Sequence, residues 1–85
     1  MGMDRNRPNA DDDRPTTEDV LRALGGTSRA HVTELAETVG ADPTLADRLC
    51  FQLQRRGYVR ARGGGVYSLT ALGERRLRRL GVAAP

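Results

Sequence analysis

Residues 32–57, VTELAETVGADPTLADRLCFQLQRRG, contain two segments of helical periodicity that are separated by a very short connection. The first segment ends at Gly40. Asp42-Pro43 opens the second, because aspartate is a favoured N-cap residue and proline suits the first helical position. A tight turn that begins with glycine between two amphipathic helices is typical of a helix-turn-helix. The apolar face of the first helix comprises Val32, Leu35, Ala36 and Val39.

A shorter helix and an extended segment are predicted before this pair. Thr16 or Thr17 can cap the shorter helix, whose first turn is acidic, and Gly25-Gly26 ends it. Residues 28–30 are expected to be extended. Two residues are candidates for the start of the helix that follows, His31 and Thr33.

After Gly57 the apolar period changes from 3.6 to 2. Residues 58–61 and 66–69 are short β-prone segments, and the glycines at 63–65 between them favour a flexible hairpin tip. Thr70 caps a last helix. The apolar side of that helix is expected to carry Leu72, Leu77 and Leu80.

This order of elements predicts an α+β winged helix, with a three-helix helix-turn-helix core, a two-stranded β wing and a C-terminal helix. The winged helix is expected over residues 16–81. Residues 1–15 are polar, with two prolines and three consecutive aspartates, and predict a disordered arm. Residues 82–85 are expected to fray.

Length and composition exclude several classes of protein. A chain of 85 residues forms one small domain, and with 38% hydrophobic and 4% aromatic residues its core must be aliphatic. The single cysteine, Cys50, and the single histidine, His31, exclude a disulfide framework and paired-ligand metal motifs. We therefore expect no enzyme activity, no cofactor and no metal. Without a long apolar run, we expect a soluble cytoplasmic protein and no membrane partner.

The charge is unevenly divided along the chain. Residues 1–47 hold five arginines against ten acidic residues, a net charge of −5, whereas residues 48–85 hold nine arginines against Glu74, a net charge of +8. Such a basic half indicates a polyanion partner, usually nucleic acid, although an ordinary solvated basic surface has the same composition. All the basic residues are arginine, which suits bidentate contact with phosphate or guanine.

The helix that begins at Pro43 divides into two faces. At 100° per residue, one arc gathers the apolar residues Ala46, Leu49, Cys50 and Leu53, which should pack on the other helices. The opposite arc holds Thr44, Arg48, Phe51 and Arg55, with Leu45 and Gln52 on one flank and Asp47 and Gln54 on the other. Arginine, glutamine and apolar side chains are the groups that read guanine, adenine and the thymine methyl in a major groove.

The stretch from Glu34 to Leu77 resembles the winged helix-turn-helix DNA-binding regulators of the MarR-like and archaeal phage-repressor-like kind. The resemblance rests on four motifs, namely Glu34-Leu35-Ala36, the Gly40 turn, Leu49…Leu53…Arg56-Gly57-Tyr58-Val59, and Leu69-Thr70-x-x-Gly73-x-x-x-Leu77. It implies a transcription regulator whose recognition helix begins at Pro43. It also implies a homodimer on a two-fold operator, with the first and last helices as candidate contacts.

Duplex DNA is therefore the expected partner, and the candidate residues fall into two groups. The base-reading candidates lie toward the N-terminal half of the recognition helix. The backbone candidates lie at the end of that helix and on the wing, where glycines allow close approach to phosphates. The first group is Thr44, Leu45, Arg48 and Gln52, and the second is Arg55, Arg56, Arg60, Arg62, Gly63 and Gly64.

Two residues of the recognition helix do not fit this description simply. Phe51 is a large aromatic on the outward face, and we expect it to pack under the N-terminal arm, to contact a dimer partner or to touch a thymine methyl, with the first two favoured. Asp47 could accept a hydrogen bond from the N4 amino group of cytosine or orient Arg48. An alternative function uses the same surface, with Phe51, Leu45 and the basic face docking an acidic protein.

Overall fold

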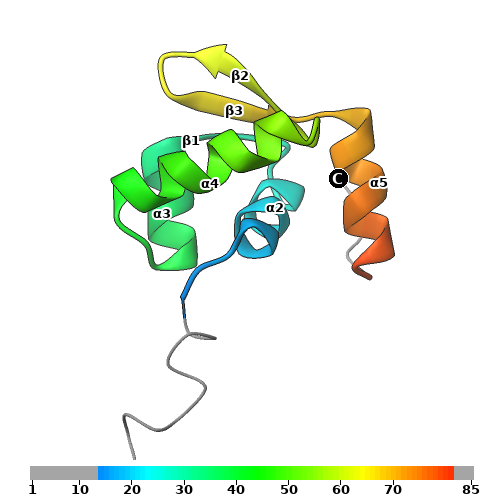
Figure 1. Ribbon diagram of the computed structural model, residues 1–85, viewed down its shortest axis with the longest axis horizontal. Helices are drawn as coiled ribbons and strands as arrows, with labels where there is room; N and C mark the ends of the chain where they lie inside the picture. Colours follow the sequence, from blue (N-terminus) through cyan, green and yellow to red (C-terminus); the bar gives the residue numbers. More distant parts are fainter. Residues whose placement is uncertain (1–13, 82–85) are drawn as a thin grey trace, which may run out of the picture.

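The computed structural model describes residues 14–81 and has the predicted α+β winged-helix architecture (Figure 1). Residues 1–13, which make up most of the predicted polar arm, and the predicted frayed segment 82–85 lie outside the described residues. The elements follow the order α2 (Thr17–Gly25), β1 (Arg29–His31), α3 (Val32–Val39), α4 (Pro43–Arg55), β2 (Val59–Gly63), β3 (Val66–Leu69) and α5 (Ala71–Arg79).

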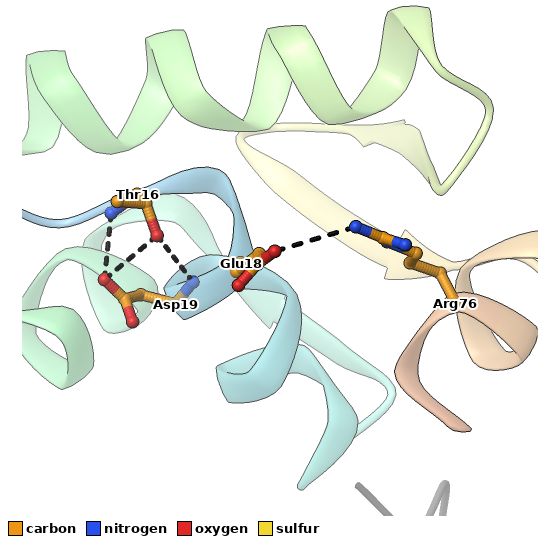
Figure 2. A network of polar contacts seen from close by, with 4 residues as sticks. All are labelled: Thr16, Glu18, Asp19 and Arg76. Carbon is orange, nitrogen blue, oxygen red and sulfur yellow. Dashed lines mark hydrogen bonds and ion pairs between the residues drawn. The ribbon is translucent and has the colours of Figure 1, made fainter. Parts of the chain in front are cut away.

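The first helix begins with a capping box. The Thr16 side chain accepts a hydrogen bond from the backbone N–H of Asp19, and the Asp19 carboxylate accepts from the N–H of Thr16 at 2.9 Å (Figure 2). Thr16 is therefore the cap, which decides between the two predicted threonines. In the same view, the Glu18 carboxylate faces Arg76 of α5 at 3.6 Å and ties the first helix to the last.

The turn between α3 and α4 is built as the sequence predicts. His31 caps α3, since its Nδ1 accepts a hydrogen bond of 3.1 Å from the N–H of Thr33. Gly40 ends the helix in the left-handed conformation, with φ of +76°. Asp42 caps α4 by accepting from the N–H of Leu45 at 2.9 Å, and Pro43 occupies the first turn. These caps fix how α4 leaves the turn.

The wing belongs to a three-stranded antiparallel sheet in which β3 lies between β1 and β2. The predicted hairpin is present, but the predicted extended segment, shifted by one residue, pairs with it and adds the third strand. The pairing is long-range, so no local signal could indicate it. A register shift between Ala61 and Gly63 lets β2 reach Gly63, and the turn therefore contains only Gly64 and Gly65.

The core is aliphatic, as composition predicts. Its buried side chains come from the helices and from one residue each of β1 and β2, with Tyr58 and Tyr67 packed against them. The prediction that Leu72 joins the apolar side of α5 is wrong: Leu72 is 43% exposed, because the centre of the buried face is occupied by Gly73 and Leu77. The buried cluster comprises Val20, Leu21, Leu24, Ala30, Leu35, Leu49, Cys50, Leu53, Val59 and Leu77.

Thr70 positions the last helix against the end of α4. Its hydroxyl donates to the carbonyl of Gly57 at 2.6 Å and accepts from the N–H of Gly73 at 3.0 Å. One side chain thus caps α5 and binds the segment that leaves α4. Over residues 14–81, no helix is long and apolar enough to span a membrane.

Candidate nucleic-acid interface

The two faces of α4 are those that the sequence predicts. Ala46, Leu49, Cys50 and Leu53 are all buried, and they form the stripe that packs on the core. The opposite face is open, with Thr44, Arg48, Phe51 and Arg55 all exposed. This helix of 13 residues therefore packs on the core with one face and presents the other face to solvent.

Two shallow hollows gather most of the candidate residues along α4. At the start of the helix, Thr44, Leu45 and Arg48 line one hollow together with Asp42 and Pro43. Toward its end, a second hollow is lined by Gln52, Arg55 and Arg56. The structure therefore groups three of the four base-reading candidates at the N-terminal end of α4, and it groups the fourth with two arginines assigned to phosphates.

Two of these candidates are less available than the others. Leu45 is half-buried and packs partly against the core, so that only part of its side chain reaches the hollow. Arg56 is the C-cap of α4 and also lines a groove shared with Glu18 of α2 and Arg76 of α5. It therefore lies on the flank toward α2 and α5, whereas Arg55 lies on the outer face.

The wing presents its arginines from an edge strand. Arg60 and Arg62 of β2 are both exposed, as are Gly63 and Gly64. The opposite end of the turn is anchored, since the carbonyl of Gly65 accepts a hydrogen bond of 2.8 Å from the N–H of Val32. The wing is therefore attached to the start of α3 on one side and open on the side that carries the arginines.

The sheet adds a basic residue that sequence reasoning missed. Arg29 of β1 is opposite Ser68 of β3, and Ser68 is opposite Arg60 of β2, so the three residues form one row across the sheet. Ala30, the next residue along β1, is buried, which puts this row on the outer face. The alternation of polar and apolar residues over 29–31 indicates that Arg29 is on the outer face, but only once β1 is known to pair with β3.

A single hydrogen bond joins the sheet to α4. The hydroxyl of Tyr67 donates to Asp47 Oδ1 at 3.1 Å. Burial, together with the Asp47 carboxylate as acceptor and as negative charge, raises the pKa of Tyr67 to about 12. Asp47 is thus bonded to the sheet, and within residues 14–81 it makes no ion pair with Arg48, contrary to one of the roles expected for it.

Cys50 follows Asp47 by three residues on α4 and is fully buried. Burial, and then the charge of Asp47, raises the pKa of its thiol from 9.0 to about 11. The thiol is therefore protonated at neutral pH and behaves as a small core side chain, as the sequence predicts.

The charges of the outer surface are largely uncompensated. In the part of the chain that the structure describes, Arg76 with Glu18 is the only ion pair within 4.0 Å. Among these residues, the arginines of α4 and of the wing have no carboxylate partner. Residues 14–81 contain no cluster of three or more metal-ligating side chains. The arrangement can attract a polyanion.

The sequence profile of the IclR helix-turn-helix domain matches residues 18–63, more than half of the 85 residues. The chain belongs to the IclR helix-turn-helix domain family. This family is one of DNA-binding transcription regulators and is not an enzyme family. The match runs from the first turn of α2 to the end of β2 and so contains α3, the turn and the whole of α4. No curated protein matches the chain.

The IclR match refines the family expected from the sequence. The helix-turn-helix class and the winged-helix fold are confirmed, whereas the MarR-like and phage-repressor-like resemblance is not supported as the specific family. Residues 64–81, which contain β3 and α5, lie outside the matched segment.

Proposed function

We propose that this IclR-type domain reads duplex DNA with the N-terminal half of α4 in the major groove. The observation that carries the proposal is the division of α4 into a buried stripe and an open face with Thr44, Arg48 and Gln52 exposed. Arg48 is the strongest candidate for specificity, because a guanidinium can bond to both major-groove acceptors of guanine. Thr44, Gln52 and the exposed part of Leu45 would contact neighbouring bases.

The wing and the end of α4 would hold the sugar-phosphate backbone. Arg60 and Arg62 project from the free edge of the sheet, and the glycines at 63 and 64 leave room beside them for a backbone or a minor groove. Arg55 belongs to the same outer surface as Arg48. Arg56 would contribute from the flank, and Arg29 adds one further basic group to the face that carries Arg60.

A two-fold dimer is part of the proposal. Leu72 on α5 is a large apolar side chain that is 43% exposed, and α5 is tied to α2 by the Arg76–Glu18 pair. Contacts centred on Leu72 would join two copies, and a two-fold operator would require their α4 helices to lie about 34 Å apart on one side of the duplex. Sedimentation of the free protein tests this, and Leu72→Asp should shift the equilibrium to monomer.

The test of DNA reading is a selection from random duplexes followed by gel-shift titration. Arg48→Ala should relax the preference at one base pair, at a cost of about 1–3 kcal/mol on the preferred sequence. The matched control is Arg22→Ala, because Arg22 is exposed on α2, the helix that packs against the buried stripe of α4. If Arg48→Ala leaves both affinity and selectivity unchanged, α4 does not read the bases.

The rival function, docking of an acidic protein, is favoured by the exposure of Phe51, at 53%. Salt separates the two functions. DNA binding releases condensed counterions, so the logarithm of the affinity falls steeply and linearly with the logarithm of the salt concentration. A protein interface with an apolar centre depends less on salt concentration.

A further inference from the structure

Phe51 is the one large aromatic side chain of the described residues that neither packs in the core nor rests against it. It is 53% exposed, whereas Tyr58 and Tyr67 are half-buried against the core cluster. The expectation that the N-terminal arm covers it concerns residues outside those described. Covering a phenyl ring of this size would remove a substantial apolar area from water.

The position of Phe51 on α4 narrows the choice of what covers it. Arg48 precedes it by three residues and Arg55 follows it by four, so both lie on the same outer face. On its other side is Asp47, which is bonded to Tyr67 of the sheet. Phe51 therefore lies between Arg48 and Arg55 on one side and, on the other side, the flank of α4 that is bonded to β3.

The charges around Phe51 favour a polyanion over a second copy of the chain. Two copies that met at Phe51 would bring together Arg48 and Arg55 of each, which have no carboxylate within 4.0 Å among residues 14–81. Like charges in close apposition disfavour association. DNA instead supplies phosphates for the arginines. In its major groove, the apolar group available to a phenyl ring is the C5-methyl group of thymine.

We infer that Phe51 is a specificity-determining residue that contacts the C5-methyl group of a thymine. The inference rests on the proposed function, since it requires α4 in the major groove. The thymine methyl group cannot be recognised by hydrogen bonding, and Phe51 would contact it beside the base that Arg48 reads.

The experiment replaces each thymine of the selected duplex, one at a time, with deoxyuridine. This change removes the methyl group and leaves every hydrogen-bonding group of the base in place. One position should lose about fourfold in affinity with the wild-type protein, since burying one methyl group is worth about that much. With Phe51→Ala, the same position should lose less than twofold, and Phe51→Leu should keep part of the penalty.

Thr38→Ala is the control, because it shortens an exposed, uncharged side chain of α3 that has no proposed role in binding, and it should keep the whole deoxyuridine penalty. Phe51→Ala should fold normally, and its thermal unfolding should confirm this. The inference is overturned if no position responds to deoxyuridine, or if the penalty is the same with and without Phe51. A wild-type dimer that Phe51→Ala converts to monomer overturns it as well.

These outcomes are distinct from failure of the proposed function itself. A protein that selects no sequence from the random pool contradicts DNA reading altogether. A protein that selects a sequence and loses preference with Arg48→Ala, but ignores the thymine methyl, contradicts only the role of Phe51.

Discussion

The hydroxyl of Tyr67 on β3 and the carboxylate of Asp47 on α4 are joined by a hydrogen bond of 3.1 Å. The two residues are 20 positions apart in the sequence, and their contact links α4 to the strands of the wing. Because both elements are proposed to contact DNA, their relative position sets which bases and phosphates can be reached together. The bond therefore connects stability to binding geometry.

Tyr67→Phe removes only the donor and should lower the free energy of unfolding by about 1 kcal/mol, the usual net value of one hydrogen bond. Urea denaturation measures this change. A double-mutant cycle with Asp47→Ala should give a coupling energy of similar size. Additive effects of the two substitutions would show that the bond contributes nothing in solution.

Gly73 lies where α5 meets the segment between α4 and the wing. A Cβ at this position would lie 2.1 Å from the carbonyl oxygen of Tyr58, a backbone atom that cannot move without displacing the turn. Gly73→Ala should therefore cost about 3 kcal/mol or prevent folding, at the upper end for overpacking. Gly26→Ala is the control, since its Cβ has a single ordinary contact at 3.7 Å and its φ of −82° suits alanine. Thermal unfolding should separate the two variants clearly.

At the wing turn, substitutions of Gly64 and Gly65 distinguish strain in the backbone from steric crowding by His31. Both have positive φ, but a Cβ at Gly65 would lie 2.7 Å from Nε2 of His31, whereas one at Gly64 would meet nothing within 4 Å. Gly64→Ala should cost about 1–2 kcal/mol for the left-handed backbone alone. Gly65→Ala should cost more, and the excess should disappear in a His31→Ser background, where serine still caps α3. Equal costs in both backgrounds would mean that the imidazole does not crowd the turn.

The elements that sequence reasoning predicted correctly are those with local causes. The caps at Thr16, Asp42 and Thr70 and the left-handed turn at Gly40 depend on a few neighbouring residues, and the buried stripe of α4 depends on its own periodicity. The candidate residues on α4 were found for the same reason, since one face must be buried and the other is then open.

What the sequence did not predict depends on contacts between distant segments. The pairing of β1 with β3, the Arg29–Ser68–Arg60 row and the Tyr67–Asp47 bond each join residues that no short-range pattern connects. Leu72 was misplaced because helical spacing shows which residues share a face but not where that face meets the core. The neighbouring residue, Gly73, is the one that packs against the backbone of Tyr58, and it can do so because it has no side chain.

Alkaline pH should destabilise the fold through Cys50. Between pH 9 and about 11 the unfolded chain loses the thiol proton, whereas the folded chain keeps it. The folded state then binds more protons, so the stability present below pH 9 is lost as the pH rises, by up to about 3 kcal/mol. Urea denaturation at several pH values should show a shallower fall for Cys50→Ala, measured in a Tyr67→Phe background so that the phenol does not contribute. Identical pH profiles for the variant and its parent would contradict this account.

The wing arginines should control the salt dependence of DNA binding without affecting base preference. Arg60 is exposed on the free edge of the sheet and has no carboxylate within 4.0 Å among residues 14–81. If it neutralises one phosphate, Arg60→Ala should reduce the slope of log affinity against log salt by about 0.9. It should also weaken binding to all duplexes equally. Arg22→Ala removes the same charge from α2 and should leave the slope unchanged. Gel-shift titrations at four salt concentrations measure both, and a slope unaltered by Arg60→Ala would remove the wing from the interface.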